Sequence, residues 1–308
     1  MLLFKKKYFY HLYIFFLVLI LFFSEFSTKI ASSKNYNILD IRVEENYDIN
    51  FDKSKVINKA FEDAFEVLIY KLIESKDRSK ISNIPLKDKK NLIENFSISN
   101  EQFINNNYIA SFNVQFSKRK ILSYLNNKYI IPSSLKEIET LLIPVLIDAD
   151  LNELYYLNQN DFYNNWNLNT KNYYLIKYIL PNEDIEDYDM IKKNINNIEN
   201  YDFKEITEKY NLKNEIILIM LKSNSQLRVF SRIKFEKDKL LLNKIFNVDN
   251  NKLEKEISNI IYDLKDNYED KWKLVNKINT SIKIPIRLSI SSSNIKLSQE
   301  LEKKLSSF

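Results

Sequence analysis

The 308-residue chain contains no glycine. Glycine enters the left-handed region of φ/ψ space at no steric cost, so every turn that needs a positive φ must here use another residue. Asparagine is the next most tolerant residue, and the chain is dense in it. We therefore expect turns at the asparagine pairs that lie between apolar runs, which are Asn106-Asn107, Asn126-Asn127, Asn164-Asn165, Asn196-Asn197 and Asn250-Asn251.

The missing residue types also exclude several kinds of chemistry. Without glycine there is no Walker-type phosphate loop, no dinucleotide fingerprint and no glycine-flanked nucleophile elbow. Without cysteine there is no disulfide, no thiolate nucleophile and no cysteine-zinc site. The single histidine, His11, lies in the apolar N-terminal segment, so a Ser-His-Asp triad or a histidine-rich zinc site is excluded from the rest of the chain. We therefore expect no catalytic residue, no cofactor and no metal, although a mechanism that uses carboxylates alone stays open.

The N-terminal residues 1–33 have the pattern of a membrane-directed leader. Lys5, Lys6 and Lys7 precede an apolar run over Leu12–Phe23, which is typical of a secretory signal. A small-residue site at Ala31-Ser32-Ser33 predicts cleavage before Lys34, whereas the longer stretch Tyr8–Phe26 is long enough for an uncleaved anchor. Both alternatives place the body across the membrane, because the lysines stay in the cytoplasm. We expect a periplasmic protein, free or anchored to the inner membrane.

Hydrophobic periodicity predicts an α/β fold with a small first domain over residues 34–130. Apolar residues recur at helical spacing over about Asp52–Glu74, and they alternate strictly over Tyr108–Phe116. In chain order this domain is predicted to contain a strand at Tyr36–Val43, the long helix, a helix at Leu86–Asn95, the strand Tyr108–Phe116 and a helix at Lys118–Leu125.

Residues 140–250 predict a second α/β domain with a mixed sheet, and residues 251–308 a C-terminal piece docked on it. Glu215–Leu221 is continuously apolar, as expected of a strand covered on both faces. The other elements predicted in the domain are strands at Leu141–Ile147 and Tyr173–Ile179, helices at Ile185–Ile198 and Phe203–Tyr210, and a hairpin of Gln226–Phe235 with Lys239–Val248. The C-terminal piece is predicted to be a helix at Leu253–Leu274, a strand at Ile282–Ile290 and a helix at Leu297–Leu305.

Two clusters are candidate sites. Asn164, Asn165 and Trp166 combine amides with an aromatic ring and could line a groove that contacts a glycan, a peptide or a partner. A loop anchored to the core by its tryptophan is the better interpretation. The carboxylates Glu183, Asp184, Glu186, Asp187 and Asp189 could bind a divalent cation. Because they follow Pro181 at the start of a predicted helix, a role as an N-cap is the better interpretation.

Several short motifs resemble the bacterial family called domain of unknown function 2066. They are Ile41-Arg42-Val43, Ala60-Phe61-Glu62-Asp63-Ala64-Phe65, Tyr108-Ile109-Ala110-Ser111-Phe112, Val114-Gln115-Phe116, Leu142-Ile143-Pro144-Val145, Asn164-Asn165-Trp166, Leu180–Asp187 and Tyr210-Asn211. The resemblance covers about residues 40–305, and the departure from the family lies at its usual glycine positions, where this chain has asparagine or another residue. The resemblance implies an envelope location and this architecture, and no catalytic residue. The second domain is also similar to α/β domains of envelope assembly proteins, such as the amino-terminal domain of TolB, which implies contact with another protein.

The balance of charge fits a protein partner better than nucleic acid. The formal net charge is +5, and the leader carries much of it, so the body is nearly neutral. We expect a non-catalytic envelope protein that binds a partner protein or an assembly. The alternative is a carboxylate-dependent hydrolase or a glycan-binding protein that acts on cell-wall material.

Overall fold

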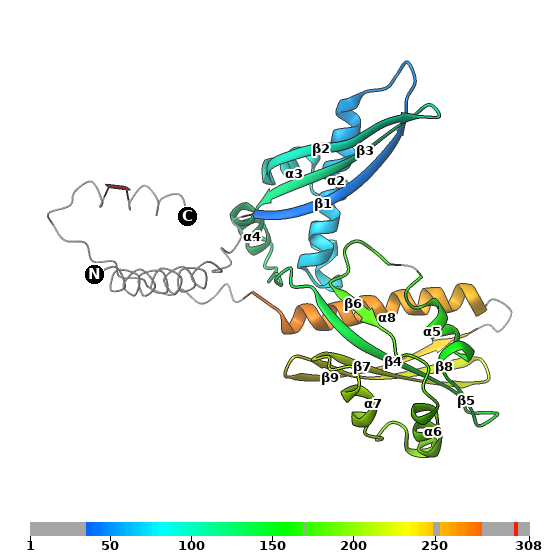
Figure 1. The fold of residues 1–308 in the computed structure, drawn as a ribbon. Coiled ribbons are helices and arrows are strands. Elements are labelled where there is room, and N and C mark those ends of the chain that lie inside the picture. Colours follow the sequence, from blue (N-terminus) through cyan, green and yellow to red (C-terminus); the bar gives the residue numbers. More distant parts are fainter. Residues whose placement is uncertain (1–34, 169, 249–252, 279–298, 301–308) are drawn as a thin grey trace, which may run out of the picture. The chain divides into compact units, whose positions relative to one another are not determined.

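A computed structural model describes residues 35–168, 170–248, 253–278 and 299–300. The fold is mixed α/β, as predicted, with a three-stranded and a six-stranded sheet (Figure 1). The described residues of Met1–Leu68 and Asn83–Tyr124 form one compact unit, and those of Ile69–Ser82 and Leu125–Phe308 form another. The leader, the predicted strand Ile282–Ile290 and all but two residues of the predicted helix Leu297–Leu305 lie outside the described residues. Within the described part, no helix is long and apolar enough to cross a membrane.

The first unit is built on a three-stranded antiparallel sheet in the order β1-β3-β2. Its strands are β1 (Asn35–Asn46), β2 (Ile93–Ile104) and β3 (Asn107–Ser117), and its helices are the first part of α2 (Lys53–Leu72), α3 (Leu86–Leu92) and most of α4 (Lys118–Asn127). The predicted alternation of β3 is confirmed: the side chains from Tyr108 to Phe116 at every second position are buried. Successive side chains of a strand point to opposite faces of the sheet, so the large apolar groups of β3 all lie on one face. The core of the first unit forms on that face.

Strand β2 was missed by the sequence analysis, which predicted a helix over Leu86–Asn95. The helix α3 ends at Leu92, and the chain enters β2 at Ile93. Most of the side chains of β2 are exposed, so the strand lacks the alternation of buried and exposed residues that marked β3. The strand is defined by its ladder with β3, in which Phe96 pairs with Val114 and Ile98 with Phe112.

The second unit is built on a mixed sheet of six strands. The strands lie in the order β5-β4-β7-β8-β9, with β6 also paired to β4; β4 is parallel to β6 and β7, and the other pairs are antiparallel. Its elements are η1 (Ser75–Ile81), β4 (Ile138–Asp148), β5 (Glu153–Tyr155), η2 (Leu157–Gln159), α5 (Asp161–Asn165), β6 (Ile176–Ile179), α6 (Ile185–Lys193), η3 (Ile195–Asn197), α7 (Lys204–Glu208), β7 (Glu215–Ser223), β8 (Gln226–Phe235), β9 (Asp238–Asn247) and α8 (Leu253–Val275).

Helices cover both faces of the central strands. On one face, α5 and α8 pack through Trp166, Leu264 and Trp272. On the other, α6, η3 and α7 pack through Ile191 and Ile206 (Figure 1). The prediction that Glu215–Leu221 is covered on both faces is thereby confirmed, since the residues of β7 from Ile216 to Met220 are all buried.

Asparagine does replace glycine at most turns with a positive φ. Six of the ten described residues with a positive φ are asparagines, and the others are Asp40, Tyr129, Leu157 and Glu236. The asparagine pairs were poorer guides to position, since only Asn106-Asn107 includes such a residue. Asn164-Asn165 lies in α5 and Asn196-Asn197 in η3, while Asn250-Asn251 is outside the described residues.

Candidate functional site

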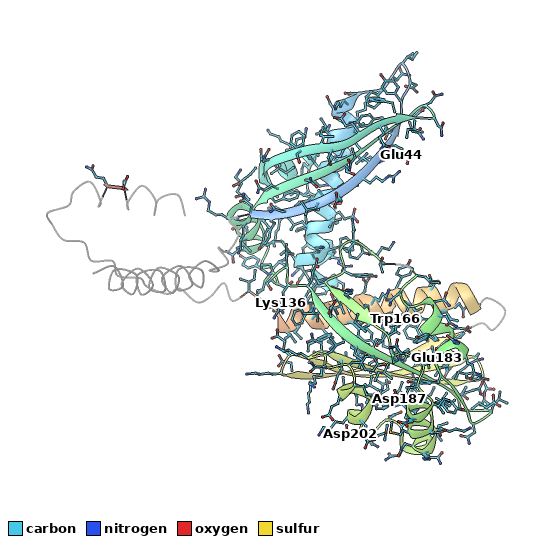
Figure 2. All side chains as sticks on the ribbon, in the orientation of Figure 1. Glu44, Lys136, Trp166, Glu183, Asp187 and Asp202 are labelled. Atoms are coloured by element: carbon cyan, nitrogen blue, oxygen red, sulfur yellow. The ribbon has the colours of Figure 1, made fainter. Side chains whose placement is uncertain are left out.

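The tryptophan of the cluster Asn164, Asn165 and Trp166 is a core residue. Trp166 is 0% exposed, and its ring lies 5.4 Å from that of Tyr178 and 6.2 Å from that of Tyr268 (Figure 2). The helix α5 that leads to it is capped by the buried Asn160, whose Oδ1 accepts the backbone N–H of Phe162 at 3.0 Å. This placement is that of the anchored loop, because Trp166 has no surface to offer a ligand.

The two asparagines beside Trp166 lie nearer the solvent and bind their own loop. The amide of Asn164 donates to the carbonyl of Asn158 at 2.9 Å, and that of Asn165 to the carbonyl of Asp161 at 2.8 Å. These contacts close the turn around α5, as short polar side chains do in such loops. The structure therefore does not bring Asn164, Asn165 and Trp166 together on one surface.

The acidic cluster forms an N-cap and an ion pair. Asp184 caps α6, since its Oδ1 accepts the backbone N–H of Glu186 at 2.9 Å. The ammonium of Lys209 lies 2.6 Å from Asp184 and 2.6 Å from Asp187. Asp187 is fully buried (it is labelled in Figure 2). Hydrogen bonds to Asp184 and Asp187 raise the pKa of Lys209, and the bond to Lys209 lowers the pKa of Asp184. Lysine thus occupies the place that a cation would take, and the described residues contain no group of three acidic or histidine side chains arranged for a metal.

A second set of charges is buried under α8. Lys265, Glu269 and Lys273 are each 1% exposed and recur every four residues, so they share one face of the helix. One Glu269 oxygen accepts the backbone N–H groups of Leu175 and Ile176 at 2.9 and 2.8 Å. Burial raises the pKa of Glu269 to about 7 and lowers the pKa of Lys265 to about 8. Through these two hydrogen bonds, Glu269 holds α8 against the start of β6.

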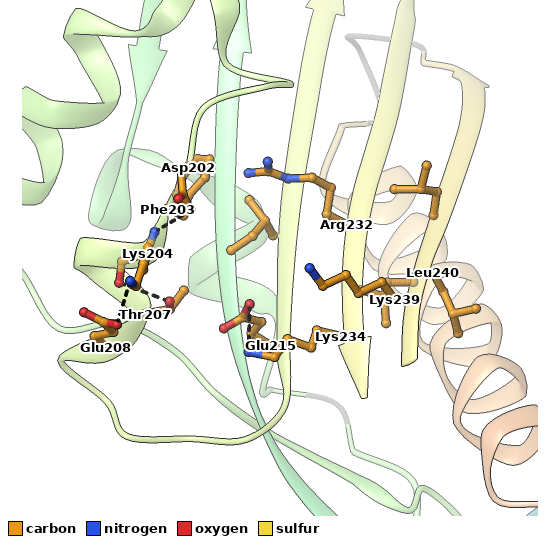
Figure 3. A pocket seen from close by; sticks show the side chains of 13 residues that line it. Asp202, Phe203, Lys204, Thr207, Glu208, Glu215, Arg232, Lys234, Lys239 and Leu240 are labelled. Carbon is orange, nitrogen blue, oxygen red and sulfur yellow. Dashed lines mark hydrogen bonds and ion pairs between the residues drawn. The ribbon is translucent and has the colours of Figure 1, made fainter. Parts of the chain in front are cut away.

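A groove lies beside α7, over β8 and β9, and we regard it as the candidate functional site. It encloses about 480 Å³, and Figure 3 shows the side chains of α7 on one side and those of the strands on the other. The groove is lined by Asp202, Phe203, Lys204, Thr207, Glu208, Glu215, Ile217, Arg232, Ile233, Lys234, Lys239, Leu240 and Leu241. Its volume falls within the range of sites that bind a small molecule or part of a peptide.

The ladder places Arg232 in the floor of this groove. Arg232 stands opposite Ile217 of β7 and Leu241 of β9. Its Nη2 donates to the carbonyl of Tyr201 at 2.6 Å, and its guanidinium lies 5.3 Å from the ring centre of Phe203. Burial lowers its pKa. Arg232 thus ties the segment before α7 to β8.

Strand β9 is uncovered on the groove side. Leu241 is 63% exposed and Ile245 is 65% exposed, while Leu240, Leu242 and Phe246, on the opposite face, pack against the core under α8. Among the described strands β9 pairs only with β8, so half of its backbone N–H and C=O groups face outward. A long edge strand with exposed leucine and isoleucine is a site where another strand can pair.

The sequence analysis found the hairpin but not this surface. Leu240-Leu241-Leu242 is apolar on both faces of a strand, which predicts a cover on both sides. The described structure supplies a cover for one face only, and this mismatch is the signal that would have identified β9 from the sequence.

Comparison with protein-family models and with curated proteins finds no match to this chain. The resemblance to domain of unknown function 2066 therefore stays a prediction.

Proposed function

We propose that this protein is a non-catalytic, envelope-directed binding protein that holds an extended segment of a partner protein along β9. The single observation that carries the proposal is the uncovered edge and face of β9, with Leu241 and Ile245 exposed beside the groove. Addition of a strand to a sheet edge obtains affinity from main-chain hydrogen bonds and specificity from pockets for alternate side chains. The predicted leader supports a location in the envelope, and a body without glycine, cysteine or histidine supports a binding role there.

The charges around the groove indicate which segment would fit. Lys234 and Lys239 face each other across β8 and β9 at one end of the groove, and Arg232 lies next to them. Glu215 pairs with Lys234 at 3.5 Å, and Glu215 and Asp202 also act on the charge of Arg232, which leaves the exposed Lys239 to meet a carboxylate of the partner. A partner strand with apolar residues at alternate positions, opposite Leu241 and Ile245, and with a carboxylate at the lysine end would be complementary.

Site-specific photo-crosslinking in intact envelopes tests this proposal. A photoreactive residue at position 241 should give one adduct with a stoichiometric partner, mapped to an extended apolar segment that carries an acidic residue. The same residue at Leu168, which is 71% exposed in the second unit but away from β9, is the matched control and should give little of that adduct. L241E should lower the yield at position 245 by about tenfold or more, because it places a carboxylate in the apolar contact.

Two results would refute the proposal. One is an equal yield at positions 241 and 168. The other is an intramolecular adduct between position 241 and residues 282–290, which would show that the chain's own predicted strand occupies the edge.

A further inference from the structure

An exposed apolar surface also lies at one end of the first unit, far in sequence from the groove. It combines the loop between β1 and α2 with the turn between β2 and β3, and we call it the aromatic tip: Tyr47, Ile49, Phe51, Phe103 and Ile104. Ile49 is 100% exposed, Phe103 60%, Tyr47 49% and Ile104 48%. Single exposed apolar residues are ordinary on a protein surface, but a contiguous group of this kind marks an interaction site.

The aromatic rings of the tip are held in place. The ring of Tyr47 lies 4.9 Å from that of Phe51 and 4.8 Å from that of Phe103. Behind them the buried Tyr108 contacts Phe51 at 5.2 Å and Phe103 at 5.3 Å. Aromatic pairs at these distances are mutually attractive, so the exposed rings are fixed to the core through Tyr108.

The two loops that form the tip are also ordered by hydrogen bonds. Ile104 pairs with Asn107 across a two-residue turn whose residues Asn105 and Asn106 have φ of 50° and 60°, as in the type I′ hairpin turn. The carbonyl of Asn106 accepts the backbone N–H of Tyr47 at 2.6 Å, which joins one loop to the other. A surface ordered before binding loses little conformational entropy when a partner docks.

Ile49 occupies a position where an apolar residue does nothing for the fold. The carbonyl of Asp48 accepts the N–H of Phe51 at 3.0 Å, and its Oδ1 accepts the N–H of Asn50 at 2.7 Å. Ile49 is thus the second residue of a closed turn, a place usually taken by proline or polar residues. Since the whole side chain of Ile49 is in solvent, it adds nothing to the core of this unit and is free to contact another molecule.

The charges around the tip are mainly negative. The segments 44–55 and 101–107 carry five carboxylates and two lysines, and Lys53 is already paired with Glu101 at 2.8 Å. The exposed Glu44 (Figure 2) and Glu45 lie near the end of β1, the strand that leads into the tip. Glu44 accepts a hydrogen bond from Asn107 at 2.8 Å, and Glu45 lies 3.6 Å from the ammonium of the half-exposed Lys59. An anionic membrane surface would repel this arrangement, whereas a protein pocket bordered by lysine or arginine would attract it.

We propose that the aromatic tip is a second docking surface, which inserts into an apolar pocket with a basic rim on a partner protein. Ile49 and Phe103 enter the pocket, and Glu44 and Glu45 face its rim. The preformed rings are the kind of central anchor that dominates protein–protein affinity. This inference does not depend on the groove at β9, because the two surfaces belong to different units.

The test is photo-crosslinking from position 49 in intact envelopes, with position 39 as the matched control. Leu39 is 62% exposed on β1 of the same unit. Position 49 should give one adduct whose linked peptide contains apolar residues next to lysine or arginine. The double variant I49S/F103S, read from a photoreactive residue at position 104, should lower the yield by about tenfold or more. E44K/E45K should lower it several-fold, whereas K55E, which removes an exposed lysine nearby, should not.

Each other outcome would overturn the inference. Equal yields at positions 49 and 39 would show that the tip is not a contact, and an adduct with a second copy of this chain would make it a self-association surface. Binding of the purified protein to vesicles of phosphatidylethanolamine and phosphatidylglycerol that is lost in I49S/F103S would make the tip a membrane anchor. An unchanged yield in E44K/E45K would show that no basic residues of the partner contact these glutamates.

Circular dichroism of each variant should match wild type, which separates loss of the contact from loss of the fold. No partner adduct at position 241 together with a partner adduct at position 49 would refute strand addition at β9 and leave the inference about the aromatic tip intact.

Discussion

Replacement of Glu269 by glutamine should abolish a distinct part of the pH dependence of stability. The ordinary pKa of the carboxyl is 4.5, and burial raises it to about 7 in the folded protein. Below pH 4.5 the group is protonated in both the folded and the unfolded state, so it carries no pH-dependent penalty. As the pH rises from about 4.5 to about 7, the unfolded state ionises first, and the free energy of unfolding falls. A difference of roughly 2.5 pKa units corresponds to about 3 kcal/mol.

Glutamine keeps the contacts of Glu269 with the chain and removes the ionisation. Its carbonyl oxygen can still accept the N–H groups of Leu175 and Ile176, which Glu269 binds at 2.9 and 2.8 Å. The charged and titratable groups that face Glu269 are Lys265, Asp266 and Lys273 on its own helix, and Tyr174 and Tyr178 from the segment that it contacts. Burial lowers the pKa of Lys265 only to about 8, so this lysine stays largely protonated between pH 4.5 and 7. Burial also raises the pKa of Asp266, but Asp266 is present in both chains, so the difference between wild type and E269Q reports on Glu269.

The assay is urea unfolding at several pH values between 4.5 and 7, followed by tryptophan fluorescence. Both tryptophans, Trp166 and Trp272, lie in the second unit, so the signal reports on the unit that contains Glu269. Wild type should lose about 3 kcal/mol relative to E269Q across this window. E94Q, at an exposed glutamate on β2, should follow wild type. A difference between wild type and E269Q that does not change with pH would refute the reasoning.

Three other substitutions test particular contacts. W166A should destabilise the second unit by about 3–5 kcal/mol, because it empties a fully buried site, and the fluorescence of Trp272 can follow the unfolding; a cost below about 1 kcal/mol would contradict the core role. K209M should cost about 1–3 kcal/mol by leaving the buried Asp187 without its ammonium partner, and D187N in the same chain should recover part of that loss; equal stability of K209M and wild type in thermal unfolding would contradict the pairing. N106A should lower the stability of the first unit by about 1 kcal/mol, since alanine tolerates a φ of 60° poorly, whereas N106G should not; circular dichroism on thermal unfolding distinguishes them.

The elements with strong periodicity were predictable from the sequence. The helix α2, the strand β3 and the hairpin of β8 and β9 each have the position that their apolar pattern predicts. Burial decides these elements, because each presents a continuous apolar face to a core. The bounds of α8 were also close to those expected, since its residues Ile257, Ile260 and Leu264 face the core.

What the sequence did not predict depends on pairing and on three-dimensional contact. Strand β2 is largely exposed, so no buried face marks it. The segment 69–82 belongs to the second unit although residues 83–124 belong to the first, and no contiguous division of the sequence expresses that. Lys209 follows Asp187 by 22 residues, so their ion pair cannot be predicted from the pattern of neighbouring residues.

The candidate site was predicted less well than the fold. Trp166 left two interpretations open, because aromatic residues beside amides can line grooves and a large ring also fills a core; the favoured one, a loop anchored by its tryptophan, is where the structure places it. The groove at β9 is made of ordinary residues, and it is a site only because nothing in the described structure covers that edge. Absence of a cover is a property of the assembled sheet, which no single segment encodes.

Hydrogen–deuterium exchange of β9 in the presence of the cross-linked partner, or of a peptide with its linked segment, tests the central claim most directly. If a strand adds to this edge, the amides of Asp238–Asn247 that face away from β8 should become protected by at least about tenfold, since each then donates to the partner. The L241E variant should show much less protection at the same peptide concentration. Unchanged exchange along β9 with the partner bound would contradict the account, because the partner would then lie elsewhere.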